Sequence, residues 1–178
     1  MAKKISTYGL LIALAFLFGF LESIFPLPVP VPGIKLGLAN IVIMTALYLM
    51  SARDAFILMI IRILLAGFTF GGMASALYSL GGGLLSFCVM AVLKKTGLFS
   101  MLGVSIAGGV FHNVGQLLVA IVVLKSRSLM GYFPVLLVSG VVTGLVVGIL
   151  SNEIYKRLKI YNVTEREENE NDIEKSKG

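Results

Sequence analysis

Residues 6–25 read STYGLLIALAFLFGFLESIF, an apolar run that ends where a proline-rich segment begins. A run of about 20 apolar residues is the length that an α-helix needs to cross the hydrocarbon core of a bilayer. The rest of the chain has the same character, since 57% of its 178 residues are hydrophobic and 13% are charged. In soluble domains about 45–50% of the residues are apolar and about 25% are charged. The composition excludes a soluble enzyme and a nucleic-acid-binding protein, and it predicts that membrane lipid surrounds most of the chain.

Breaks in the apolar sequence divide residues 1–160 into six expected spans. After the prolines, the breaks are SARD at 51–54, a Gly-Gly pair at 71–72, KKTG at 94–97 and KSRS at 125–128. The expected spans are 6–25, 36–51, 54–70, 73–93, 98–124 and 131–154. Because each run is continuously apolar and does not alternate, helices are favoured over a closed barrel.

The predicted fold is therefore an all-α integral membrane protein, a six-helix transmembrane bundle in one domain. Residues 161–178 read YNVTEREENENDIEKSKG. This polar, charged composition is typical of disordered segments, and a solvated cytoplasmic tail is expected there.

Basic residues near the span ends predict the orientation, because cytoplasmic loops of membrane proteins carry an excess of Lys and Arg. With six spans, both termini share one side, which collects eight basic residues, and the other side has three. The eight are Lys3, Lys4, Arg53, Lys94, Lys95, Lys156, Arg157 and Lys159, and the three are Lys35, Lys125 and Arg127. We therefore expect a multi-pass protein of the cell membrane with both termini in the cytoplasm.

The first external connection, residues 25–33, carries four of the five prolines at every second position. Proline fixes its own φ and restricts the preceding residue to extended conformations, so this segment is expected to be extended and not helical. It is either a rigid spacer between two spans or a stiff lid across the outer mouth of the bundle. In the second case residues 25–35 form a gate.

Polar side chains within the spans are costly in lipid and therefore informative. Arg62 falls near the middle of the third span, and Glu22 lies within one turn of the outer end of the first. In the fifth span, His112 and Gln116 share one helix face by their i, i+4 spacing, with Asn113 beside them. The candidate substrate-binding residues, most of them in the outer half of the membrane, are Glu22, Lys35, Asn40, Arg62, His112, Asn113 and Gln116.

Two interpretations of this polar layer remain open. In the first, it forms a pocket that opens to the outside and binds a small polar or anionic molecule. In the second, Arg62 and Glu22 only pair, His112 is a buried core histidine with its partners, and Lys35 is an interfacial anchor. The amides of Asn40 and Asn113 then only form hydrogen bonds between helices.

Small residues repeat at every fourth position on three spans, and such faces let helix backbones approach closely. The sets are Gly9 with Ala13, Ala15 with Gly19, Ser75 with Ser79 and Gly83, and Gly140 with Gly144 and Gly148. Packing within the bundle is one interpretation. The other is that one face docks another membrane protein, for which the first span is the best candidate.

Catalysis by this chain alone is not expected. Its carboxylates outside the tail are Glu22, Asp54 and Glu153, on different segments and on both sides of the membrane. Phosphoryl or diphosphate chemistry needs clustered carboxylates to hold Mg²⁺, and no aspartate-rich, HExxH or Walker motif is present. One His and one Cys would make a poor metal site. No metal and no cofactor are expected, and active transport would need partner subunits.

Three stretches carry a family resemblance, together with the third span that contains Arg62. They are GIKLGLANI at 33–41, YSLGGGL at 78–84 and FHNVGQ at 111–116. From about residue 6 to 155 the chain resembles the Gx transporter family, which also carries the label heptaprenyl diphosphate synthase component I. That family is similar to the substrate-binding S components of energy-coupling factor (ECF) transporters.

The resemblance implies six helices, cytoplasmic termini, an external loop over an outward-facing site, and a first helix whose small residues meet the coupling subunit. At the matching positions this chain has Gly9, Ala13, Ala15 and Gly19. The implied partners are a small-molecule ligand, a transmembrane coupling protein and two cytoplasmic ATPases. The synthase label conflicts with the residues, because the usual prenyl diphosphate synthases have aspartate-rich motifs.

Two functions follow as hypotheses. The first is the substrate-capture subunit of an importer for a small, anionic or vitamin-like molecule. The second is a non-catalytic membrane accessory of heptaprenyl diphosphate synthesis or of a redox system.

Overall fold

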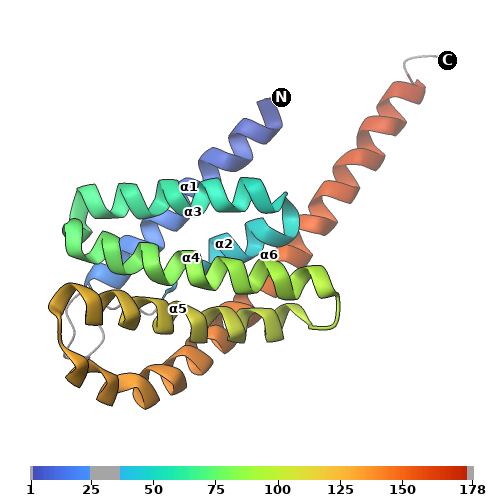
Figure 1. The fold of residues 1–178 in the computed structure, drawn as a ribbon. Coiled ribbons are helices and arrows are strands. Elements are labelled where there is room, and N and C mark those ends of the chain that lie inside the picture. Colours follow the sequence, from blue (N-terminus) through green and yellow to red (C-terminus); the bar gives the residue numbers. More distant parts are fainter. Residues whose placement is uncertain (1, 25–36, 176–178) are drawn as a thin grey trace.

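The computed structural model describes the backbone of residues 2–24 and 37–175, and the side chains of residues 7–24 and 37–159. All regular elements in these ranges are helical (Figure 1). They are α1 (Ala2–Ile24), α2 (Asn40–Leu49), α3 (Ala52–Ala66), a π-helical turn (Gly67–Gly71), α4 (Gly72–Thr96), α5 (Met101–Leu124), a 3-10 turn (Arg127–Tyr132) and α6 (Phe133–Lys175). The proline-rich segment and the gate expected at 25–35 lie outside the described residues.

Four stretches of the described chain are long and apolar enough to cross a membrane: Thr7–Ile24, Ala52–Thr96, Met101–Leu124 and Arg127–Lys159. The second of these is a hairpin, in which α3 and α4 run side by side in opposite directions (Figure 1). The chain reverses at the π-helical turn and at Gly72, whose φ of +70° is a conformation that glycine adopts without strain. This is the Gly-Gly pair at which the sequence places the end of the third span.

Glycines bring α4, α5 and α6 into close contact. A Cβ at Gly115 would stand 2.5 Å from the carbonyl oxygen of Gly81, and one at Gly144 would stand 2.6 Å from Cα of Ile106. The Gly81–Gly83 run leaves α4 continuous, and Gly140, Gly144 and Gly148 all face the backbone or side chains of α5. These small-residue faces therefore serve packing within the bundle.

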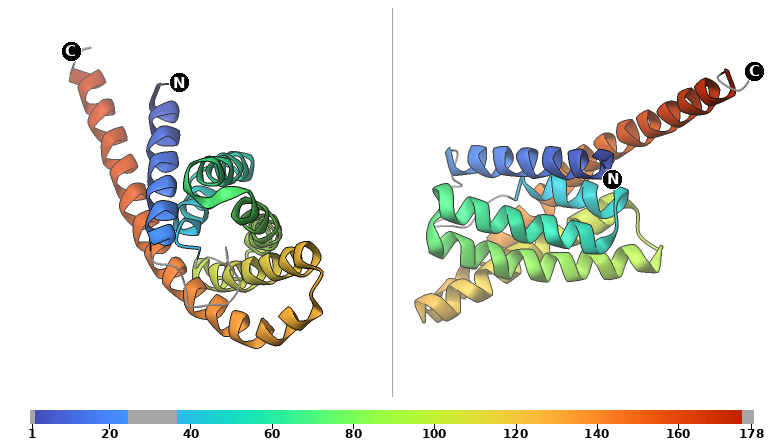
Figure 2. Two further views of the ribbon diagram at one scale, coloured as in Figure 1. Left: turned by 90° about the vertical axis from the view of Figure 1, so that its left-hand side faces the viewer. Right: turned by 90° about the horizontal axis from the view of Figure 1, so that it is seen from above.

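Helix α2 forms the centre of the apolar core. Every residue from Ile41 to Leu47 is buried, and the helix contacts α1, α3 and α6; Figure 2 shows it between α3 and α6. Its 10 residues span only about 15 Å, half of a hydrocarbon core of about 30 Å. The span expected at 36–51 is thus helical only in part. The Ser151 hydroxyl of α6 donates a hydrogen bond to the Ile41 carbonyl at 3.1 Å.

The C-terminal end of α2 is held by a lysine from α4. Lys94 Nζ donates to the Leu47 carbonyl and lies 5.0 Å from the centre of the Tyr48 ring. Tyr48 in turn meets Tyr155 of α6 edge to face, with ring centres 6.1 Å apart. A cation beside the last carbonyls of a helix offsets the negative end of its dipole.

Replacing Lys94 by methionine is expected to lower the free energy of unfolding by about 1 kcal/mol, because a charged donor to a helix-terminal carbonyl is lost while the apolar stem is kept. Lys95→Met is the matched control, since Lys95 is the next residue and is exposed. The thermal unfolding midpoints of both variants and of the native protein are measured in the same detergent. Equal shifts in the two variants would contradict the capping role.

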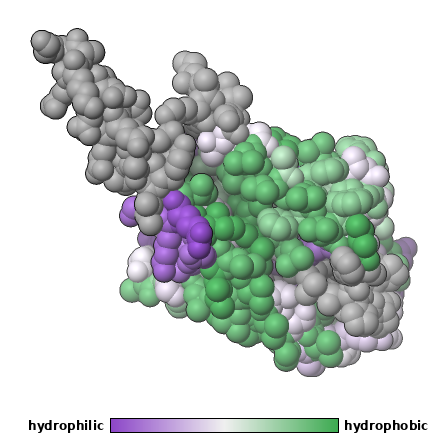
Figure 3. All heavy atoms as spheres, turned by 180° about the vertical axis from the view of Figure 1, so that it is seen from behind, coloured by the Kyte–Doolittle hydropathy of each residue, from purple (hydrophilic) through white to green (hydrophobic). Residues whose placement is uncertain are grey.

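The molecular surface is apolar over most of the view in Figure 3 and turns polar where α6 leaves the body of the bundle. Exposed polar residues of α6 there include Glu153, Lys156, Arg157 and Lys159, and Arg157 Nε bonds Glu153 Oε1 at 3.0 Å. Both ends of the described chain lie at this end of the bundle (Figure 2). The backbone of α6 continues to Lys175, through most of the expected tail. The disorder expected for residues 161–178 stays a prediction.

Candidate functional site

Glu22, near the end of α1, reaches the start of α2. Its carboxylate accepts hydrogen bonds from the backbone N–H groups of Gly37 and Leu38, the second at 2.9 Å. Those two groups precede the first helical turn, in which Asn40 N and Ile41 N already bond to the Gly37 and Leu38 carbonyls. The first N–H groups of a helix have no partner within the helix, so a side chain or ligand must satisfy them. Glu22, which is 5% exposed, supplies that acceptor for the turn directly before α2.

Arg62 brings α3 to the same point. Its side chain is buried at 7% exposure, and its Nη2 lies 3.4 Å from Oδ1 of Asn40, the first residue of α2. The Glu22 carboxylate lies near the guanidinium. Arg62 Nε has no hydrogen-bond partner among the described residues. The N-terminal end of α2 is thus surrounded by one cation, one carboxylate and one amide.

His112 and Gln116 approach from α5. Their side-chain nitrogens, both named Nε2, are 3.0 Å apart, and both residues are almost completely buried. A Cβ at Gly37 would stand 3.8 Å from His112 Cδ2, and one at Gly82 would stand 3.1 Å from His112 Cε1. The imidazole therefore lies between the start of α2 and the backbone of α4. The i, i+4 pair expected on one face of the fifth span is in contact.

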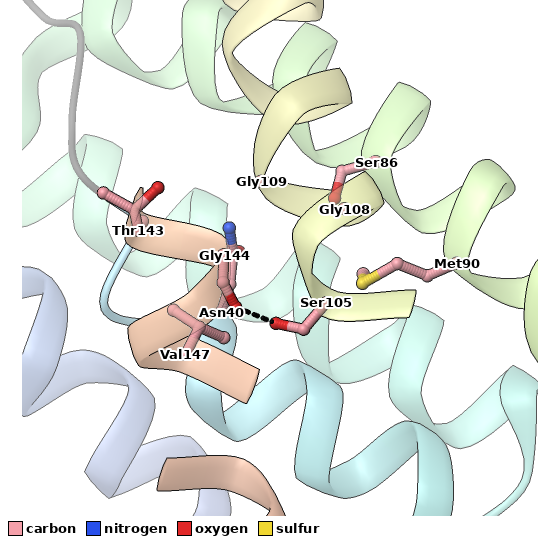
Figure 4. Close-up of a pocket in the computed structure, with 10 residues that line it drawn as sticks. Asn40, Ser86, Met90, Ser105, Gly108, Gly109, Thr143, Gly144 and Val147 are labelled. Atoms are coloured by element: carbon pink, nitrogen blue, oxygen red, sulfur yellow. Dashed lines mark hydrogen bonds between the residues drawn. The ribbon is translucent and has the colours of Figure 1, made fainter. Parts of the chain in front are cut away.

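A small cavity continues from this cluster into the bundle (Figure 4). Its volume is about 10 Å³, close to what one water molecule requires. Its polar lining comes from Asn40, Ser86, Ser105 and Thr143. The Ser105 hydroxyl donates to the Gly144 carbonyl at 2.8 Å, whereas Ser86 Oγ is buried without a partner among the described residues.

The other sequence candidates fall elsewhere. Asn113 Nδ2 donates to the Leu136 carbonyl of α6 at 2.8 Å, which is the interhelical hydrogen bond of the alternative interpretation. Lys35 lies outside the described residues. Of the docking candidates on α1, Gly9 and Ala13 are exposed and Ala15 and Gly19 are buried. The four small residues thus divide between an outer and an inner face of the helix.

Sequence reasoning missed the backbone donors at Gly37 and Leu38, as well as the hydroxyl groups around the cavity. Gly37 has a φ of +87°, which non-glycine residues rarely adopt. A glycine three residues before a polar residue that opens an apolar helical run, as in GLANI, was the available signal. Its meaning depends on a carboxylate 15 residues earlier in the chain, which no local pattern identifies.

The cluster has unused hydrogen-bonding capacity. Within the described residues, Arg62 Nε, His112 Nδ1 and Gln116 Oε1 are buried without a hydrogen-bond partner. Buried polar atoms without a partner are rare and cost about 1–3 kcal/mol each. The cluster therefore offers both donors and an acceptor to a polar ligand. Among the described residues, no three His, Cys, Asp or Glu side chains come together to hold a metal ion.

The apolar helices and the buried polar cluster define a multi-pass helical membrane protein with a polar site inside its bundle. Within that class, the chain belongs to the family described as heptaprenyl diphosphate synthase component I, whose model matches residues 11–154. This match confirms the family resemblance of the sequence. No match was found among curated proteins or among solved structures.

Proposed function

We propose that the chain is the substrate-binding membrane subunit of an importer for a small anionic or vitamin-like molecule. Partner subunits, a transmembrane coupling protein and two ATPases, would supply the energy. In this proposal six helices cross the cell membrane, both termini are cytoplasmic, and the site opens to the outside. Residues 25–35, with Lys35, would form its gate.

The observation that carries the proposal is the polar cluster of the buried residues Arg62, His112 and Gln116 with the half-buried Asn40. It brings together side chains from three helices, and its atoms without partners are those a polar ligand would satisfy. Ionisable residues inside a membrane protein are rare and usually mark a pathway or a binding site. A purely structural cluster would be expected to satisfy its own hydrogen bonds.

The family description favours a second candidate function, a non-catalytic accessory of heptaprenyl diphosphate synthesis. The two functions differ in their partners. Extracting the full chain from its native membrane in a mild detergent, and identifying its companions and any bound small molecule by mass spectrometry, separates them. An importer subunit is expected to co-purify with ATPases and a small anion. Co-purification of a prenyl diphosphate synthase with no ATPase would replace the first proposal by the second.

Replacing His112 and Gln116 together by leucine is expected to abolish the retention of the small molecule while changing the midpoint of thermal unfolding by less than about 3 °C. Removing both partners of a buried hydrogen bond in favour of apolar groups is nearly neutral for stability, so the loss would be specific to binding.

The matched control is Asn113→Leu, which lies on the same helix but faces α6. It is expected to retain the ligand. If the double variant retained the ligand as well, the cluster would not be its binding site.

A further inference from the structure

The N-terminal end of α2 has the properties of an anion site inside the membrane. The helix covers only about half of the hydrocarbon thickness, so its two ends cannot both reach the membrane surface. The N–H groups of Gly37 and Leu38 lie in the turn that leads directly into α2, beside the positive end of the helix dipole. Gly37 is buried and Leu38 is half-buried, so these groups need an acceptor from the protein or from a ligand.

A second, independent feature points to an anion at the same place. Arg62 is only 7% exposed, and its guanidinium contacts Asn40, the first residue of α2. Its Nε has no partner among the described residues. A buried guanidinium and a helix N-terminus both favour a carboxylate or phosphate oxygen. We call the Gly37 and Leu38 N–H groups together with the Arg62 guanidinium the α2 anion site.

A carboxylate of the chain itself already occupies this site. Glu22 accepts hydrogen bonds from both N–H groups, and its carboxylate lies near Arg62. Glu22 comes from the last turn of α1, two residues before Ile24. Its side chain can therefore leave the site by rotation, without unfolding the centre of a helix.

We infer that Glu22 is an internal substitute for the substrate, and that a substrate carrying one carboxylate displaces it from the α2 anion site. The inference rests on the proposed function and names its substrate class. The exchange replaces one buried carboxylate by another, so the charge beside Arg62 is unchanged and neither N–H group loses its acceptor.

Sodium acetate is a suitable probe, because it carries the glutamate carboxylate without the rest of the side chain. The full chain is purified in detergent as native protein and as Glu22→Ala, and its unfolding midpoint is measured in acetate and in chloride at equal ionic strength. We expect Glu22→Ala to unfold about 4–8 °C below the native protein in chloride. Acetate should recover at least half of that loss in a saturable manner.

Two further variants keep the test decisive. Glu22→Gln preserves the shape of the side chain, and it replaces Glu22→Ala in the test if that variant does not fold. Acetate should raise the unfolding midpoint of Glu22→Gln by more than it raises that of the native protein. Glu153→Ala removes an exposed carboxylate of α6 and should respond as the native protein does. The inference is overturned if acetate stabilises neither Glu22 variant more than chloride does, or if inorganic phosphate restores stability better than acetate.

This test is independent of transport. Acetate rescue requires only the purified chain, so it can succeed even if the companions found in native membranes are those of a synthase. Conversely, a failed rescue beside a co-purifying anion that depends on His112 and Gln116 would overturn the role of Glu22 and leave the importer proposal intact.

Discussion

Replacing Gly109 by alanine is expected to destabilise the chain by about 3 kcal/mol or more, because the added methyl group has no space between two helix backbones. A Cβ at this position would collide with the Gly140 carbonyl oxygen and would stand 3.0 Å from Cα of Gly144. Backbone atoms cannot rotate away as a side chain can, so α5 and α6 would have to separate. That separation would also disturb the hydrogen bond from Ser105 to the Gly144 carbonyl.

Gly103→Ala is the matched control on the same helix. The nearest atoms to its added Cβ would be 3.7 Å away, an ordinary contact, and alanine favours a helix by about 1 kcal/mol over glycine. Unfolding by denaturant or heat should therefore show a large loss for Gly109→Ala and no loss for Gly103→Ala. If the two variants lost the same stability, the close contact of α5 with α6 would not contribute to the fold.

The helical character of the chain and its family were predictable from sequence, and both are confirmed. Long apolar runs can only be helical spans when the surrounding solvent cannot satisfy backbone groups. The short α2 was not predictable, because residues 36–51 are mostly apolar and composition does not show where a helix begins. The boundary depends on the turn before α2, where Gly37 has a positive φ and a carboxylate from another helix accepts the N–H group of Leu38.

The candidate site was predictable in its residue types more than in its contacts. The spacing of His112 and Gln116 correctly predicts that they meet, since the i, i+4 relation is local to one helix. Asn113 is adjacent in sequence but points about 100° away on a helix with 3.6 residues per turn, and it bonds α6. Which helix meets which face depends on packing between glycines far apart in sequence, so the neighbours of a polar side chain cannot be derived from its own segment.

Replacing Arg62 by methionine is expected to lower the free energy of unfolding by about 3–5 kcal/mol, the usual cost of removing one of two opposite charges that are buried close together. The affected partner is Glu22, which keeps its backbone donors but loses the adjacent cation. The variant should also lose the co-purifying anion. Arg53→Met, on the exposed start of the same helix, should change stability by no more than about 0.5 kcal/mol and should retain the ligand.

A double variant separates the charge effect from the packing effect. Adding Glu22→Gln to Arg62→Met removes the buried carboxylate that has lost its adjacent cation, so the double variant should be more stable than Arg62→Met alone, by at least about 1 kcal/mol. Binding should not return, because the guanidinium that contacts Asn40 is still missing. If the loss of stability in the double variant equals the sum of the losses in the two single variants, the two charges act independently. In that event the Arg62 guanidinium would not be part of one anion site with the start of α2.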